Sequence, residues 1–308
     1  MLRNVASPFS ELRRRAWHQA WKMSACAAAN APPVALHELA DKLRIRRIEF
    51  LPLLSTAGVG PVENGYVVYI NTRAPGATRI SKKCLDLTHE DFTSLTSPLR
   101  FSVAHEMAHV FFFDLLGGDC ESNLLRRHWQ ALENSCNQMA RVLLVPRKSL
   151  LREIEGDLFA LDRLMHVVRR FRVSPQVFIY RLHLDDMRDA FQGHDAGLIA
   201  CIQKRPEGPR VIAAHALGGL ATIRWPSGES SSEGMPLEKL FLSVDLGALV
   251  AKREHVLADA EVSWRPEKVA PCKLELNPVR NDPLMSILSV RLAGYLTPPK
   301  NKLDSHLA

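Results

Sequence analysis

Residues 100–109 read RFSVAHEMAH and carry the strongest chemical signal in the chain, the motif His105-Glu106-Met107-Ala108-His109. Residues 99–116 are mostly apolar and contain no proline or glycine, which predicts a helix over this range. Histidines four residues apart lie on the same face of a helix, so both imidazoles can reach one zinc ion. Glu106 lies next to that face, where its carboxylate can accept a proton from a metal-bound water.

A catalytic zinc site needs a third protein ligand, because it keeps three ligands and one open position. Glu133 lies 24 residues after His109 (133 − 109) and begins a second apolar helical stretch, ENSCNQMARVLL. Antiparallel packing of this helix on the first would bring Glu133 to the metal and complete a His₂Glu site. Glu121 and His128 are the alternatives, and both fall in the polar connection between the two helices.

Composition limits the class of protein. The 308 residues are 46% hydrophobic and 24% charged, as in a globular protein, and the length favours about two domains. The net charge of +7 permits an anionic partner without requiring one. No apolar run approaches the roughly 18 residues of a membrane span, so no membrane partner is expected. Six scattered cysteines without a C-x-x-C pair favour a reducing cytoplasm over a disulfide framework.

The sequence pattern divides the chain into four segments. Residues 1–31 form a lead-in helix that ends before Pro32-Pro33, residues 32–157 contain the two motif helices, residues 158–195 are helical, and residues 196–308 are rich in strands. A turn at Glu63-Asn64-Gly65 precedes a strand at 66–71, and residues 72–98 are expected to form a long connection. After residue 195, six short runs rich in valine, isoleucine and leucine alternate with turn residues, at 197–203, 210–214, 221–225, 261–264, 273–276 and 286–292.

The two motifs, taken together, resemble the ImmA/IrrE family of bacterial metallopeptidases. That family shows R-F-T-x-A-H-E-x-G-H followed by E-x-x-A-N-x-F-A-x-x-L-L-x-P, and residues 133–146 here read E-x-x-C-N-x-M-A-x-x-L-L-V-P. The likeness covers residues 32–184 and includes the strand that ends in Ile70-Asn71. Ala108 stands where the family pattern has a glycine, and Cys136 stands where it has an alanine. Both exchanges are between small residues. The connection at 72–98 is longer than is typical.

The resemblance implies an α+β fold with a zincin-like metallopeptidase domain. It implies the metal ligands His105, His109 and Glu133, with Glu106 as the catalytic residue, and one Zn²⁺ per chain, with Mn²⁺ as the alternative. Family members of known role cleave helix-turn-helix repressors, so the expected activity is that of a zinc-dependent endopeptidase that derepresses stress or mobile-element genes. Family architecture also suggests that the C-terminal strand-rich domain is a GAF-like sensor.

Two other functions remain open. One is a non-catalytic DNA- or protein-binding regulator that retains a structural metal site, which Glu106 argues against because such a site needs no general base. The other is a protease associated with a toxin–antitoxin pair, which differs only in its target. The sequence does not indicate an oligomeric state.

Two weaker features suggest where partners bind. The strand at 66–71 would bind the target peptide by strand addition, through Val67, Tyr69 and Asn71. The helices within residues 158–195 resemble a helix-turn-helix pair, and Arg169, Arg170 and Arg172 are its candidate DNA contacts.

Overall fold

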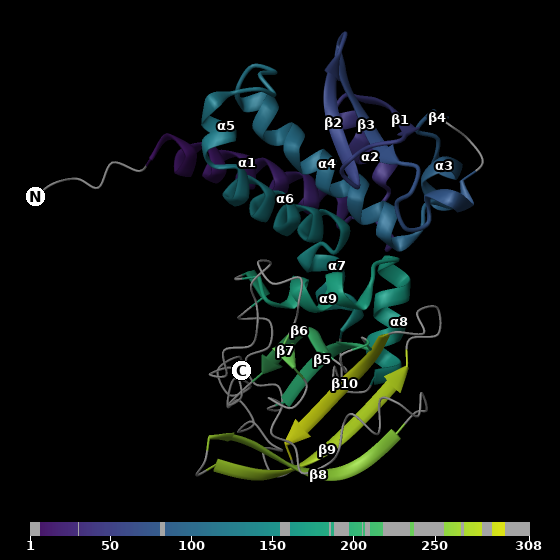
Figure 1. Cartoon of the computed structure of the whole chain (residues 1–308), viewed down its shortest axis with the longest axis vertical. Coiled ribbons are helices and arrows are strands. Elements are labelled where there is room, and N and C mark those ends of the chain that lie inside the picture. The colour runs from purple at the N-terminus through teal and green to yellow at the C-terminus, as the bar shows by residue number, and fades with distance from the viewer. Residues whose placement is uncertain are drawn as a thin grey trace, which may run out of the picture. The chain divides into compact units, whose positions relative to one another are not determined.

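The computed structural model describes residues 7–29, 31–80, 84–154, 161–184, 186–187, 197–204, 206, 210–217, 235–236, 256–265, 268–278 and 285–292. The contacts within the chain divide it into two compact units. The first comprises residues 1–153 and 168–174, and the second comprises residues 154–167 and 175–308. Figure 1 labels the helices and strands of both units.

The first unit contains a four-stranded sheet in the order β2-β3-β1-β4. The strands are β1 (Ile45–Leu51), β2 (Ala57–Val62), β3 (Gly65–Asn71) and β4 (Cys84–Leu85). β3 pairs in parallel with β1 and antiparallel with β2, while β4 pairs antiparallel with β1. β3 therefore lies inside the sheet, and β2 and β4 form its edges.

The turn between β2 and β3 confirms the hairpin expected at Glu63-Asn64-Gly65. Asn64 has a φ of 60°, in the left-handed region that asparagine tolerates better than most residues. Gly65 is required by a close backbone approach, because a Cβ at this position would lie 2.1 Å from the carbonyl oxygen of Arg44. The N–H of Tyr66 donates to the same oxygen at 3.0 Å, which joins the start of β3 to the chain that leads into β1.

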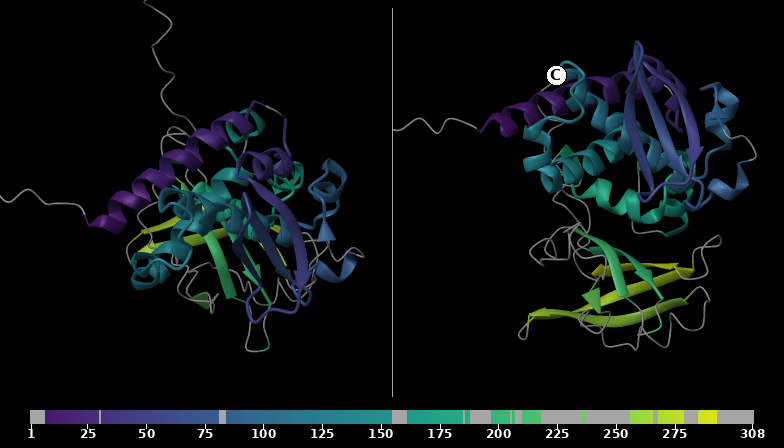
Figure 2. Two further views of the ribbon diagram at one scale, coloured as in Figure 1. Left: turned by 90° about the horizontal axis from the view of Figure 1, so that it is seen from above. Right: turned by 45° about the horizontal axis from the view of Figure 1, so that its top comes forward.

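Seven α-helices and one 3-10 turn accompany this sheet in the described part of the first unit. They are α1 (Pro8–Ala27), α2 (Leu36–Lys42), η1 (Ala77–Arg79), α3 (His89–Ser94), α4 (Ser97–Leu115), α5 (Asn123–Arg127), α6 (Trp129–Leu144) and α7 (Arg147–Glu153). α4 contacts β2 and β3 of the sheet and also packs against α1 and α6 (Figures 1 and 2). Twelve of its 19 residues are buried, because it has neighbours on most sides.

Two expectations for the first unit need correction. The connection expected at residues 72–98 contains η1, β4 and α3, which are too short to produce a recognisable periodicity. The helix expected over residues 126–144 is interrupted at His128, which follows α5 and precedes α6. The second motif helix therefore begins at Trp129, one turn before Glu133.

The second unit contains an antiparallel six-stranded sheet in the order β7-β6-β5-β10-β9-β8. The strands are β5 (Gly197–Gln203), β6 (Arg210–Leu217), β7 (Met235–Pro236), β8 (Val256–Arg265), β9 (Lys268–Pro278) and β10 (Met285–Leu292). Five of the six apolar runs coincide with or fall within β5, β6, β8, β9 and β10, and the run at 221–225 lies outside the described residues.

The helical segment expected at residues 158–195 contains α8 (Leu161–Phe171) and α9 (Pro175–Leu182). α9 packs against β5 and β6 and is grouped with that sheet, whereas the division between the units falls within α8. Among the described residues, no helix combines the length and hydropathy needed to cross a membrane.

Candidate metal centre

Two facing stripes of side chains, each with a four-residue spacing, build the site. Because residues four apart are neighbours on the surface of a helix, consecutive side chains of each stripe lie next to one another. The stripe on α4 consists of Phe101, His105, His109 and Phe113, and the stripe on α6 consists of Trp129, Glu133 and Asn137. The contacts run in opposite directions along the two helices: His105 meets Asn137 and Glu133, and His109 meets Glu133 and Trp129. The helices are therefore antiparallel, as the sequence predicts.

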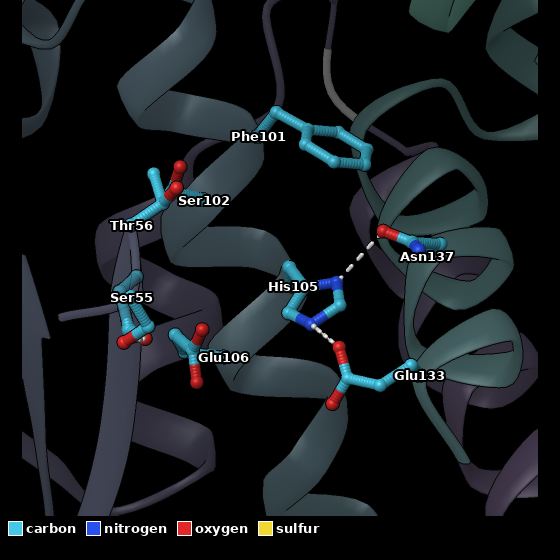
Figure 3. Close-up of a pocket in the computed structure, with 9 residues that line it drawn as sticks. Ser55, Thr56, Phe101, Ser102, His105, Glu106, Glu133 and Asn137 are labelled. Atoms are coloured by element: carbon cyan, nitrogen blue, oxygen red, sulfur yellow. Dashed lines mark hydrogen bonds and ion pairs between the residues drawn. The ribbon is translucent and has the colours of Figure 1, made fainter. Parts of the chain in front are cut away.

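The structure brings His105, His109 and Glu133 together, with one ligand atom of each within 4.8 Å of the others. Nε2 of His105 lies 3.3 Å from Oε2 of Glu133, and Nε2 of His109 lies 3.2 Å from Oε1. The two Nε2 atoms are 3.2 Å apart. Figure 3 shows the Glu133 carboxylate facing the His105 ring. Two imidazole nitrogens and a carboxylate are a donor set that suits a divalent metal ion such as zinc, so this group could bind one.

Neither alternative third ligand reaches this group. Glu121 is 86% exposed at its side chain, and its Oε2 lies 3.2 Å from Nη2 of Arg126. The ring of His128 stacks on Phe9 of α1, with 4.6 Å between the ring centroids. Both residues lie in the connection that joins the two motif helices in sequence, as expected, and their side chains contact other residues there.

Glu106 is buried and lines a cavity of about 400 Å³ next to the three-residue group. The cavity is lined by Ser55, Thr56, Ala57, Phe101, Ser102, His105, Glu106, Glu133 and Asn137. Figure 3 shows Ser55 and Thr56 on one side of Glu106 and His105, with Glu133 and Asn137 on the other. The cavity therefore has α4 as its floor, the start of β2 as one wall and α6 as the opposite wall.

The close packing of charged groups shifts three pKa values. Burial raises the pKa of Glu106, and the charge of Glu133 adds to this, against the opposing effect of the two histidines. Burial would lower the pKa of His105, but its hydrogen bond with Glu133 and the neighbouring carboxylates outweigh burial and raise it. Burial would raise the pKa of Glu133, but hydrogen bonds from both histidines lower it to about 2. Glu133 thus stays a carboxylate, while Glu106 is a stronger proton acceptor than a surface glutamate.

Asn137 is a site residue that the sequence analysis did not assign. Its Oδ1 lies 2.9 Å from Nδ1 of His105, so the amide oxygen accepts a hydrogen bond from the ring N–H. This contact places the proton of a neutral imidazole on Nδ1 and leaves the lone pair of Nε2 free for a metal. The signal was present in the sequence, since Asn137 follows Glu133 by one helical turn within the quoted motif.

The sheet topology contradicts the prediction that the strand at 66–71 binds the target peptide by strand addition. Val67, Tyr69 and Asn71 belong to β3, which is already paired on both sides, so no further strand can be added there. Asn71 has another role: its Nδ2 donates to the carbonyl oxygens of Leu53 and Ser55, each at 2.8 Å. Asn71 therefore fixes the loop that leads into the cavity wall.

The structure also argues against the helix-turn-helix interpretation of α8 and α9. Every residue of α9, the second helix of the pair, is buried or half-buried, so α9 does not present a face that could enter a DNA groove. Arg172 donates from Nη2 to the carbonyl oxygens of Thr93 and Leu95, at 2.8 and 2.9 Å. Arg170 pairs with Glu153 at 3.1 Å. Arg169 is exposed on α8, and a DNA contact through it stays a prediction.

The chain is similar to known proteins at two levels, a family profile and a solved structure. Residues 97–183 match the profile of peptidase family M78, described as the IrrE N-terminal-like domain. Among solved structures, the chain is similar to a Mycobacterium tuberculosis transcriptional regulator, at 13% identity and a TM-score of 0.45, over 92% of this chain and 93% of that chain. No curated protein matches the sequence. The matched segment begins at the first residue of α4 and includes both helices that carry the metal group.

Proposed function

We propose that this chain is a zinc-dependent endopeptidase that cleaves a helix-turn-helix transcriptional repressor. The observation that carries the peptidase part is the position of Glu106, a buried carboxylate with a raised pKa that lines a cavity beside a His₂Glu group. A purely structural metal site would not need such a base, and this argues against a non-catalytic regulator. The match of residues 97–183 to the profile of a peptidase family supports the same conclusion.

The residues of the site divide the chemistry between them. His105, His109 and Glu133 would hold the metal, and Asn137 would orient the His105 ring. Bound zinc would supply a Lewis acid and lower the pKa of a water molecule in the cavity. Glu106 would accept the proton of the attacking water and then donate it to the leaving amine. Mn²⁺ is the alternative metal, since the carboxylate of Glu133 and water are donors that suit it.

The target segment would bind in an extended form along β2. β2 is an edge strand, and the residues that lead into it, Ser55 and Thr56, line the cavity together with its first residue, Ala57. An unpaired edge offers backbone N–H and C=O groups to a further strand. Pro61 has no N–H and is exposed, so such pairing would be confined to the half of β2 that is close to Glu106. This assigns to β2 the role that the sequence analysis gave to β3.

The repressor as target, the control of stress or mobile-element genes, and the cytoplasmic location rest on family likeness and on the chemistry of the chain. All six cysteines lie among the described residues and form no disulfide there, in keeping with a reducing compartment. The antiparallel sheet with α9 packed on it supports the proposal that the second unit is a separate sensor domain of GAF-like type. A protease of a toxin–antitoxin pair would use the same site on another target.

The test compares the wild-type chain with Glu106→Gln. Both proteins are loaded with zinc and incubated with helix-turn-helix repressors from the same genome, and cleavage is followed by mass spectrometry. We expect wild type to cut a repressor, Glu106→Gln to be inactive, and both to hold about one zinc, because Glu106 is a base and not a ligand. Equal cleavage by Glu106→Gln would refute its catalytic role. Tight repressor binding without cleavage by either protein would favour the non-catalytic regulator.

A further inference from the structure

Large apolar side chains are exposed at only three positions in the described part of the chain. They are Leu51, Leu54 and Trp129, with exposed fractions of 39%, 111% and 57%. Single exposed apolar residues are common on any surface, but a group beside a cavity indicates a binding site. Leu54 directly precedes Ser55 on one wall of the cavity, and Trp129 lies one helical turn before Glu133 on the other.

Trp129 extends the apolar surface of the metal centre. Its ring stacks on His109, with 6.0 Å between the centroids and 22° between the planes. His109 in turn stacks on Phe113, with a centroid separation of 5.9 Å. One part of the indole ring is therefore covered by a metal-binding histidine, and the rest is open to solvent. An indole face held in this way can stack on an incoming side chain at little cost in conformational entropy.

Hydrogen bonds fix the segment around Leu54, at the opposite wall of the cavity. Leu54 lies between Leu53 and Ser55, whose carbonyl oxygens both accept hydrogen bonds from the side chain of Asn71. Figure 3 shows Ser55 across the cavity from Glu133, with His105 and Glu106 between them. A segment bound over Glu106 would therefore pass between these two walls. Leu54 and Trp129 do not line the cavity themselves, but Leu54 directly precedes the lining residue Ser55 and Trp129 lies one helical turn before the lining residue Glu133.

We infer that Trp129 forms a specificity subsite that selects a large apolar side chain of the target next to the bond that is cut, with Leu54 as a second apolar contact. This inference rests on the proposed peptidase function and names the class of residue that the site accepts. Tryptophan also attracts cationic side chains, but a bound divalent metal at His109 would repel lysine and arginine. The subsite therefore favours aromatic and large aliphatic residues.

The test uses two peptide hydroxamates, which chelate zinc without being cleaved, with phenylalanine or serine next to the chelating group. Their dissociation constants are measured on zinc-loaded wild type, Trp129→Ala, Trp129→Phe and the control Trp21→Ala. Trp21 lies beside Trp17 on α1, with 6.0 Å between the ring centroids, so this control removes an equal ring elsewhere in the same unit. The ratio of the two constants cancels any change in zinc affinity that the substitutions cause.

We expect wild type, Trp129→Phe and Trp21→Ala to prefer the phenylalanine compound by roughly tenfold, and Trp129→Ala to lose most of this preference. An equal preference in wild type and Trp129→Ala, or no preference in wild type, would overturn the inference. If the protein shows the preference but cleaves no repressor, the proposed function is refuted and the subsite is supported. Cleavage of a repressor without the preference would refute the subsite alone.

Discussion

Asn137 should control how tightly the chain holds its metal, although it is not a ligand. The Asn137→Ala variant removes the oxygen that lies 2.9 Å from Nδ1 of His105. Without this acceptor, the neutral His105 ring can carry its proton on Nε2, the nitrogen that faces Glu133 and His109. The ring also loses a contact that fixes its orientation. Both effects reduce the fraction of the protein in which the metal-binding lone pair is available.

The loss of this acceptor should weaken zinc binding by about 10- to 100-fold, or roughly 1.4 to 2.7 kcal/mol. The dissociation constant is measured by competition with a chromophoric chelator at constant pH. Asn137→Asp should retain tight binding, because a carboxylate also accepts the hydrogen bond from Nδ1. The matched control is Asn134→Ala on the same helix, since Oδ1 of Asn134 accepts from Nε2 of Gln130 and not from a ligand. Unchanged zinc affinity in Asn137→Ala, or an equal loss in Asn134→Ala, would refute the reasoning.

Two further predictions concern the third ligand and acid stability. Glu133→Ala should lose zinc during dialysis while Glu121→Ala retains it, as measured by atomic absorption; the opposite result would move the third ligand to Glu121. Burial, followed by the charge of a neighbouring histidine, lowers the pKa of His215 from 6.5 to about 3. The unfolded chain therefore binds a proton between these pH values that the folded chain does not, so stability is unaffected above pH 6.5 and falls as the pH decreases. Relative to His215→Gln, wild type should lose about 2 kcal/mol more in free energy of unfolding between pH 7 and pH 5, measured by urea titration. Equal losses would show that His215 does not resist protonation in the folded state.

The parts of the fold that the sequence predicts well are those with a strong local signal. The helix that carries His105 and His109 is apolar over several turns and has no proline or glycine within its predicted range, so its existence and the common face of the two histidines follow from the sequence pattern. Glu133 was favoured over Glu121 and His128 because it begins an apolar stretch of helical period, and the fold places its carboxylate beside both histidines. The turn at Glu63-Asn64-Gly65 was equally clear, since asparagine and glycine adopt backbone conformations that most residues avoid.

The parts that the sequence did not predict depend on pairings between distant segments. Nothing within residues 66–71 indicates whether the strand is central or at an edge. Its position depends on whether β1 pairs with the side of β3 that β2 leaves free. Because β1 pairs with β3 on one side and β2 pairs with it on the other, β2 forms the edge of the sheet. The glycines and the proline of β2 make this strand difficult to recognise from the sequence. In the same way, Arg172 looks like a candidate DNA contact in sequence, and only the fold shows that it binds two carbonyl oxygens near the end of α3.

The spacing of the two stripes explains why one site holds so many functional groups. Antiparallel helices with side chains every four residues align one pair per turn, so fixing the contact of His105 with Asn137 also fixes Glu133 between the histidines and Trp129 against His109. A shift of α6 by one turn would break all of these contacts together. The proposed metal binding, the orientation of the His105 ring and the proposed apolar subsite are therefore not independent of one another. They are three consequences of one helix register, and the burial of α4 between the sheet and its neighbouring helices holds that register in place.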